Sequence, residues 1–522
     1  MNVACLLSES ARRSPEAPAW KFGDCGATYA ELAGRVGRIA AGLRTRGLAP
    51  GDRVVVCLPN RPELLEVLMA TLWAGLVTVP VNWHLHPEEV SYIVGQCGAR
   101  AIVLSDATAA VTDALPAGEA RPVVIHADHG HAGPGAGASL EELALSPVRP
   151  GDPADVEPGQ AAWLFYTSGT TGRPKGATLS HRSLLAMTLN YYADVDPIRP
   201  GSVLAHAAPL THGSGLYLIP AIGRAAANVI SDVPTFDAAS FLGLIERERA
   251  THVAFLAPVM LRRVLDSPRL AGTDLSALHS ILVGGAPLYK ADLEEAQDRL
   301  GPVITQIYGQ GEAPMTITVM PAAESAAFGG VRLGSCGRPF TGVQVRIAGA
   351  QDSSEAPPKE LGEVCVRGDV VMNGYWNNPE ATAAALHEGW LRTGDVGYLD
   401  SGGYLHLTDR VKDVIITGGS NVYPREVEEV LLTHPGVSEA AVVGIPDPEW
   451  GESVAAFVVT RPGAQEDPAV SAEALVQHVR DHLASFKKPR TITFVPELPK
   501  NATGKFLKRQ LRDLVVTTGK ER

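Results

Sequence analysis

The chain has 522 residues, which exceeds what one hydrophobic core usually organises, so at least two domains are predicted. Apolar residues make up 45% and charged residues 20%, as in an ordinary soluble globular protein. The net charge of −12 leaves no overall positive field for non-specific binding of nucleic acid. A small anionic ligand is not excluded, because a local pocket can be basic on an acidic protein.

Cysteine usage and apolar runs predict a cytoplasmic protein without a membrane span. The six cysteines are scattered and form no CxxC pair, which is typical of reduced thiols and too sparse for a disulfide scaffold. The first ten residues lack the basic segment of a signal peptide. The longest apolar stretch, residues 67–81, contains Gly75 and Pro80 and is shorter than the ~20 residues of a spanning helix.

From residue 51 the sequence alternates short apolar runs with helical periodicity. Residues 52–58 predict a strand, 62–73 a helix and 76–81 the next strand. Further strands are predicted at 101–104, 123–126, 163–166, 203–207, 253–256, 281–283 and 303–307. Strands that alternate with helices indicate an α/β fold with mostly parallel, buried sheets.

The texture changes twice towards the C-terminus. Residues 343–347 and 363–367 predict alternating strands of a smaller β subdomain. Beyond Asp409 we expect a compact α+β unit, with its elements at 426–432, 440–443, 454–459, 474–482 and 491–494. The predicted domains are therefore 1–409 and 410–522. Between residues 484 and 512 eight basic residues stand against one acidic residue, a cluster that could form a solvated face or meet phosphates.

The strongest chemical signal is the segment from Tyr166 to Gly176, YTSGTTGRPKG, after an apolar strand. Glycines let backbone N–H groups approach a polyphosphate, hydroxyls donate to its oxygens, and a lysine neutralises charge. Pro174 stands where a P-loop would have its second glycine, so an ordinary P-loop NTPase is disfavoured. A helix is predicted to begin near Ser180.

This segment resembles the phosphate loop of the adenylate-forming enzymes, which include acyl-CoA synthetases. Five further segments resemble that family in the same order, namely 284–287 (GGAP), 308–312 (YGQGE), 390–395 (WLRTGD), 409–412 (DRVK) and 499–505 (PKNATGK). The resemblance implies nucleotide binding by these residues: Thr167, Ser168, Gly169, Thr170, Thr171, Gly172, Lys175, Gly285, Ala286, Pro287, Tyr308, Gly309, Gln310, Gly311, Asp395, Arg410 and Lys505. Tyr308 would stack on adenine, and Asp395 and Arg410 would hold the ribose. Glu312 and Thr170 would hold Mg²⁺, and Lys412 would be the hinge of a mobile C-terminal domain.

Catalytic roles are implied for Lys505, Lys175, His212 and Glu312. When a carboxylate attacks the α-phosphate of ATP, an anion approaches a polyanion, so lysines, N–H groups and Mg²⁺ must offset the charge. His212 has no second His or Cys at metal-ligand spacing, which argues against a metal site there. No acidic residue occurs from 203 to 231 to pair with an ammonium group, so an amino-acid substrate is disfavoured.

The resemblance also implies a binding site for coenzyme A, formed by Gly418, Gly419, Trp450, Phe486, Lys488 and Arg490. Stacking and basic charge suit an adenine that carries phosphates. Two positions depart from the family pattern. Gly311 replaces a threonine whose hydroxyl would contact the α-phosphate, a hydrogen bond worth ~1.5–3 kcal/mol, and His84 replaces an arginine that would meet CoA.

The sequence therefore predicts an AMP-forming carboxylate–CoA ligase that uses ATP, Mg²⁺ and CoA. Two alternatives stay open, a stand-alone enzyme that loads a separate carrier protein and a non-catalytic nucleotide-binding relative. The acid is left open between aromatic, branched, polycyclic and aliphatic classes, and so is a homodimer.

Overall fold

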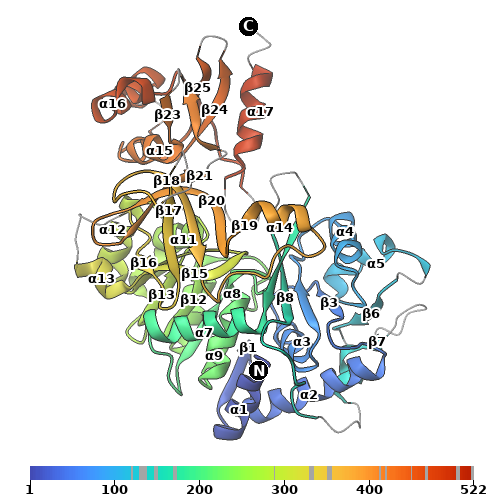
Figure 1. Cartoon of the computed structure of the whole chain (residues 1–522). Helices are drawn as coiled ribbons and strands as arrows, with labels where there is room; N and C mark the ends of the chain where they lie inside the picture. Colours follow the sequence, from blue (N-terminus) through green and yellow to red (C-terminus); the bar gives the residue numbers. More distant parts are fainter. Residues whose placement is uncertain are drawn as a thin grey trace.

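The computed structural model describes residues 1–118, 121–128, 138–145, 151–167, 173–286, 288–327, 334–349, 355–410, 413–417, 420–447, 450–464, 468–500 and 506–518. Within these residues the strands form four sheets, two large ones and two small ones. The two large sheets lie side by side, and the C-terminal part of the chain (dark orange to red) stands mainly above the sheet drawn in green and yellow-green (Figure 1). None of the described helices is long and apolar enough to cross a membrane. All six cysteines are free thiols.

The first large sheet is built from the N-terminal third of the chain. Its strand order is β7-β6-β5-β3-β4-β8-β9, and every pair except β8–β9 is parallel. The strands are β3 (Arg53–Val56), β4 (Val77–Pro80), β5 (Ala101–Leu104), β6 (Val123–His126), β7 (Ala138–Ser139), β8 (Ala161–Thr167) and β9 (Lys175–Ser180). The helices are α2 (Tyr29–Thr45), α3 (Pro62–Trp73), α4 (Pro87–Cys97), α5 (Val111–Ala114) and α6 (Leu140–Ala144). Helix α3 has the predicted bounds, because Pro62 starts it and Gly75, at a φ of 73°, follows its end.

The second large sheet has the strand order β16-β15-β14-β13-β12-β10-β11-β1-β2 and is parallel from β14 to β1. Its strands are β1 (Pro18–Phe22), β2 (Cys25–Thr28), β10 (Val203–His206), β11 (Ala227–Ile230), β12 (His252–Leu256), β13 (Ser280–Val283), β14 (Ile304–Gln310), β15 (Ala313–Met320) and β16 (Arg338–Pro339). The helices are α1 (Cys5–Arg13), α7 (His181–Asp194), α8 (Gly213–Leu216), α9 (Leu218–Gly223), α10 (Ala238–Glu248), α11 (Pro258–Asp266), α12 (Lys290–Leu300) and α13 (Ala322–Ala327). The predicted α/β fold with mostly parallel sheets is confirmed.

The two small sheets follow in the chain. One is antiparallel, with the order β17-β18-β20-β19 and β21 beside β20, and consists of β17 (Gln344–Ala348), β18 (Gly362–Arg367), β19 (Leu386–His387), β20 (Trp390–Leu399) and β21 (Leu405–Arg410), with helix α14 (Pro379–Ala385). The other belongs to the C-terminal unit and consists of β22 (Ile415–Thr417), β23 (Ser420–Val422), β24 (Val437–Asp447), β25 (Gly451–Thr460) and β26 (Thr491–Phe494), with helices α15 (Pro424–Leu432), α16 (Ala472–His482) and α17 (Lys508–Thr518). The predicted hinge residue Lys412 lies outside the described residues.

The structure adds an element beside the glycine-rich segment that was not predicted from the sequence. A strand, β9, stands between this segment and helix α7, and it pairs antiparallel to β8 with Thr167 opposite Lys175. Helix α7 begins after Ser180, as predicted, and the Ser180 hydroxyl accepts a hydrogen bond from the Ser183 N–H. The segment therefore joins two neighbouring strands at a sheet edge.

Candidate active site

The described ends of the glycine-rich segment lie beside a carboxylate from the second large sheet. Residues 168–172, with the predicted Ser168, Gly169, Thr170, Thr171 and Gly172, lie outside the described part of the chain. Thr167 Oγ1 donates to Glu312 Oε1 at 3.3 Å, and Tyr375 Oη donates to the same oxygen at 2.7 Å. The Lys175 ammonium lies 5.5 Å from the centre of the Tyr375 ring. The fold thus brings Thr167 and Lys175, from one segment, close to Glu312 and Tyr375, which are distant in the sequence.

Tyr375 is a site residue that the sequence reasoning missed. Burial is the main cause that raises the pKa of its phenol, and the Glu312 carboxylate adds to it, so the phenol stays a hydrogen-bond donor. Its backbone forms a bridge to Ala177 of β9. The only signal in the sequence would have been an aromatic residue in a Gly/Asn-rich stretch after the β subdomain strands, which is too common to single out.

The second group of predicted nucleotide residues surrounds Asp395 on β20. Tyr308 Oη donates to Asp395 Oδ2 at 2.6 Å, and Gln310 Nε2 donates to the same oxygen at 2.5 Å. Arg410 Nε lies 3.0 Å from Asp395 Oδ1. Tyr308 and Asp395 are both buried. The carboxylate is thus fixed by three side chains of the predicted set, and a ribose hydroxyl would have to share or replace one of these donors.

The turn after β14 connects these two groups. Tyr308, Gly309 and Gln310 lie at the end of β14, and Gly311 and Glu312 form the turn to β15. A side chain at Gly309 would collide with the backbone of Met315, because an added Cβ would lie 2.5 Å from its nitrogen. Beside this turn, Gly285 follows β13 with a φ of 81°, which favours glycine, and Ala286 follows it. Pro287 lies outside the described residues.

The structure gives a steric reason for glycine at position 311, which the sequence alone did not show. A Cβ at this position would lie 2.5 Å from Thr167 Cγ2 and 2.7 Å from Phe165 Cδ1. The threonine of the family motif therefore cannot be accommodated here unless Thr167 and Phe165 move. The departure is part of the local packing between the turn and strand β8.

We expect Gly311→Thr to lower both stability and the rate of adenylation rather than to restore a missing hydrogen bond. Overpacking of this kind costs about 1–3 kcal/mol of unfolding free energy, and moving Thr167 disturbs its contact with Glu312. Chemical unfolding and ATP–pyrophosphate exchange measure the two effects. Gly311→Thr combined with Thr167→Ser, which removes the colliding methyl group, should recover part of the loss. A faster single variant with unchanged stability would contradict this explanation.

His212 lies next to the nucleotide group rather than within it. It precedes α8, and its ring centre is 4.9 Å from that of Phe165, the residue that limits space at Gly311. Burial lowers the pKa of His212 to about 4, so the imidazole is neutral near pH 7. A neutral ring can donate or accept a hydrogen bond, whereas it supplies no positive charge to a phosphate.

The described residues of the predicted CoA site lie on the C-terminal unit. The Arg490 guanidinium lies 5.0 Å from the centre of the Trp450 ring, and Arg490 Nη1 also pairs with Asp447 at 3.3 Å. Phe486 is half exposed, and Lys488 is partly buried. Gly418 and Gly419 lie outside the described residues, but Thr417 before them pairs with Gly451, next to Trp450. His84 is exposed, with its ring 3.8 Å from that of Trp83.

The basic cluster at 484–512 is largely neutralised within the protein. Five of its seven described cations form ion pairs, as follows: Lys487 with Glu426, Arg490 with Asp447, Lys500 with Glu439, Lys508 with Asp409 and Glu428, and Arg512 with Asp413. The catalytic candidate Lys505 is outside the described residues. The interpretation of the cluster as a phosphate-binding surface is therefore restricted to a few of its members.

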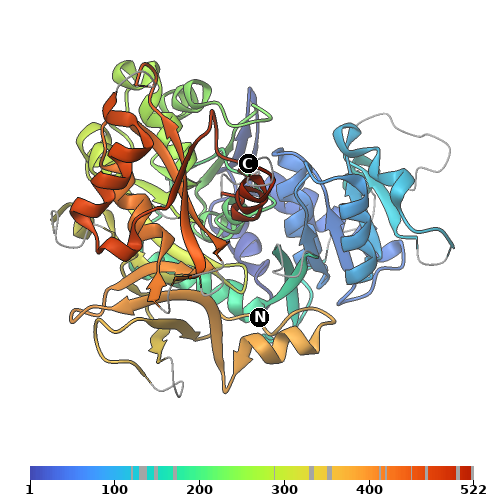
Figure 2. The ribbon, with the colours of Figure 1, turned by 90° about the horizontal axis from the view of Figure 1, so that it is seen from above.

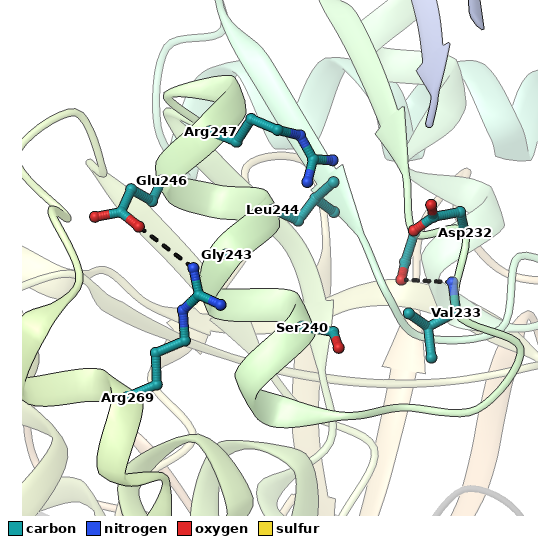
Figure 3. Close-up of a pocket in the computed structure, with 9 residues that line it drawn as sticks. Asp232, Val233, Ser240, Gly243, Leu244, Glu246, Arg247 and Arg269 are labelled. Carbon is teal, nitrogen blue, oxygen red and sulfur yellow. Dashed lines mark hydrogen bonds and ion pairs between the residues drawn. The ribbon is translucent and has the colours of Figure 1, made fainter. Parts of the chain in front are cut away.

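A surface pocket of about 400 Å³ lies apart from all these residues. It opens between the end of β11 and helix α10, and its lining includes Ser240, Arg247 and Arg269 (Figure 3). Arg269 lies against Gly243 and pairs with Glu246 at 3.4 Å. Its lining shares no residue with the predicted site.

Comparisons with known proteins agree with the motifs. The family model described as "AMP-binding enzyme" matches residues 7–376, and "AMP-binding enzyme C-terminal domain" matches residues 426–505. A feruloyl-CoA synthase of Amycolatopsis sp is 38% identical over 511 residues, 96% of each chain. The fatty acid–[acyl-carrier-protein] ligase ScoC of Streptomyces coeruleorubidus is 37% identical over 506 residues, covering 96% of this chain and 94% of the relative.

Among solved structures, the amide bond synthetase McbA from Marinactinospora thermotolerans superposes with a TM-score of 0.88 at 32% identity, covering 98% of this chain and 99% of that one. The family match spans most of the chain, and relatives align over nearly all of it. The chain therefore belongs to the AMP-binding enzymes, the adenylate-forming family whose motifs it carries.

Proposed function

We propose that this enzyme is an AMP-forming carboxylate–CoA ligase. In the first step a carboxylate oxygen attacks the α-phosphorus of ATP, the bond to the β-phosphate breaks, and pyrophosphate leaves. In the second step the sulfur of CoA attacks the carbonyl carbon of the acyl-adenylate, a C–S bond forms, the thiol proton is lost, and AMP leaves. The family membership and the named ligase relatives support this reaction class.

One observation carries the proposal, the arrangement of two polar groups around the turn after β14. The first group contains the Thr167 hydroxyl, the Lys175 ammonium and the Glu312 carboxylate, and its hydroxyl and ammonium suit phosphates. Asp395 and Arg410 form the second group, which suits a ribose. The residues present fit a magnesium ion, because Mg²⁺ commonly takes one or two protein carboxylates and completes its shell with phosphates and water. Glu312 would hold it, and the ion would offset phosphate charge.

The C-terminal unit would serve both steps. We infer that it rotates about Lys412 and presents Lys505 for adenylation and then residues 418–419 for thioester formation. Trp450 and Arg490 lie together and would clasp the nucleotide end of CoA.

A carrier protein is the second candidate acceptor. Arg490 already pairs with Asp447, which reduces the positive charge open to CoA phosphates, and a relative of similar identity is named as a carrier-protein ligase. The McbA neighbour adds an amine as a third acceptor class to test.

The test separates acid activation from acyl transfer. ATP–pyrophosphate exchange with a panel of aryl and alkyl carboxylic acids should show activation of at least one acid. Free CoA, a phosphopantetheinylated carrier protein and a simple amine are then offered with that acid. The proposal expects acyl-CoA as the main product. If ATP–pyrophosphate exchange occurs but the acyl group is transferred only to the carrier protein or the amine, the acceptor must be reassigned. If no acid supports ATP–pyrophosphate exchange, the non-catalytic alternative is favoured.

A further inference from the structure

A cluster of buried and partly buried charged and polar side chains lies where the C-terminal unit meets the rest of the protein. We call it the junction cluster, and it consists of Tyr289, Asp409, Arg425, Glu428 and Lys508. Arg425 and Glu428 are only 8% and 3% exposed, which is rare for charged residues unless they are paired. None of these residues belongs to the nucleotide or CoA groups described above.

The contacts of the junction cluster cross between the two parts of the chain. Glu428 Oε1 accepts from the Val442 N–H at 2.9 Å and faces Lys508 Nζ at 3.4 Å, both within the C-terminal unit. Glu428 Oε2 accepts from Tyr289 Oη at 3.3 Å, and Lys508 Nζ lies 3.5 Å from Asp409 Oδ2. Tyr289 and Asp409 belong to the large part, so two contacts hold the units together here.

Arg425 strengthens the same junction through backbone groups. Its Nη1 donates to the Leu407 carbonyl at 3.1 Å, and Leu407 lies on β21 two residues before Asp409. Its Nε pairs with Glu429 at 3.0 Å. Strand β21 is therefore held from two helices of the C-terminal unit, α15 and α17.

Charge balance makes Lys508 the central member of the junction cluster. Burial by itself would lower the pKa of Lys508, but Glu428, Asp409 and Asp413 outweigh burial and raise it, so the ammonium stays charged. Burial raises the pKa of Glu428, and Lys508 opposes this shift. Without the ammonium, two buried carboxylates would remain near each other with no cation between them, which is strongly unfavourable.

The position of Lys508 connects the junction to the chemistry. It is the first residue of α17 and follows the predicted catalytic residue Lys505 by three positions. Asp409, the partner of Lys508, precedes Arg410, which pairs with Asp395 at 3.0 Å. The N-terminal end of α17 faces the large part of the protein (Figure 1), and the view from above places α17 between the two large sheets (Figure 2).

We propose that Lys508 is a positioning residue for the adenylation step. By joining Glu428 to Asp409 it holds the C-terminal unit in the arrangement that keeps Lys505 within reach of the nucleotide. Rotation about Lys412 for thioester formation would have to break the contact with Asp409. This inference rests on the proposed function.

A neighbouring ion pair provides a matched control. Arg512 lies one turn further along α17 and pairs with Asp413 at 2.9 Å. Both residues follow the predicted hinge position, so this pair stays within the C-terminal unit and need not break on rotation. Arg512→Met removes a cation from the same helix face without cutting a contact between the two units.

The experiment compares the two half-reactions in full-length variants. Lys508→Met is expected to lower ATP–pyrophosphate exchange about tenfold or more, while thioester formation from a supplied acyl-adenylate stays within about twofold of wild type. Asp409→Asn, which acts from the other side of the contact, should give the same asymmetry. Lys508→Arg should restore most of the exchange activity, and Arg512→Met should leave both rates within about twofold. Equal loss of both half-reactions, or no loss in Lys508→Met, would overturn the inference.

A measurement independent of catalysis separates this inference from the proposed function. Hydrogen exchange of peptides that cover β21 and α15 should become faster in Lys508→Met and stay at the wild-type rate in Arg512→Met. If wild-type protein activates no acid, the proposed function fails. The hydrogen-exchange comparison alone then decides whether Lys508 holds the junction. Unchanged exchange in Lys508→Met would refute the junction itself.

Discussion

Replacing Lys505 by alanine is expected to slow acyl-adenylate formation by about 10²- to 10³-fold. Negative charge builds up on the α-phosphate as the carboxylate attacks, and removing one preorganised positive donor from such a site costs a factor of this size. The transfer of a supplied acyl-adenylate to the thiol should largely survive, because that step needs no further attack on a phosphate. ATP–pyrophosphate exchange and single-turnover thioester formation measure the two steps.

Lys500→Ala is the matched control for this prediction. Lys500 stands five residues before Lys505 and carries the same charge, but its ammonium pairs with Glu439 at 2.5 Å. The control should therefore leave adenylation within a few-fold of wild type. If Lys505→Ala reduced both half-reactions equally, the division of labour between them would be wrong.

The second large effect is a loss of stability as the pH falls from about 6.5 towards 4. His181 and His206 are fully buried, and burial lowers the pKa of each to about 4 from an ordinary value of 6.5. His206 lies between Ser214 Oγ and Asn228 Oδ1, both at 3.0 Å, and burial outweighs the Asn228 hydrogen bond, which by itself would raise the pKa.

Between these pH values the unfolded chain binds protons that the folded chain does not, so lowering the pH favours unfolding. Well above pH 6.5 each histidine is neutral in both states and does not lower the free energy of unfolding. By pH 4 each has lowered it by about 3 kcal/mol. The pKa of Glu295, which Arg262 holds at about 2, adds its own loss only below about pH 4.5. The range from 6.5 to 4.5 therefore reports on the buried histidines, His212 included, while the carboxyls of Glu66 and Glu428, whose pKa burial raises, act in the opposite direction.

Urea unfolding at several pH values, followed by tryptophan fluorescence, measures this dependence. His206→Gln should reduce the slope between pH 6.5 and 4.5 by about 1 kcal/mol per pH unit, because one titrating group is removed. His387→Gln, at an exposed position on β19, should leave the slope unchanged. An unaltered slope in His206→Gln would show that other groups cause the acid sensitivity.

Local sequence patterns determined the secondary structure and the order of the motifs. Helix α3 and strands β5 and β6 have the predicted bounds, because apolar periodicity and turn residues act over a few neighbouring positions. The motifs and their order along the chain were sufficient to indicate the family. The assignments of individual site residues and of the domain boundary at 409 remain predictions.

Only the tertiary structure decided which side chains meet. Tyr375 joins Glu312 across 63 positions, and Lys508 reaches Asp409 across 99. A single sequence carries no record of such distant pairings, since they arise when separate elements pack together. For the same reason the sequence alone indicated that Gly311 lacks a useful hydroxyl group, and that the basic residues at 484–512 could form a solvated face or meet phosphates. In the folded protein the glycine at 311 avoids a collision with Thr167, and most of the described basic residues at 484–512 are paired with carboxylates.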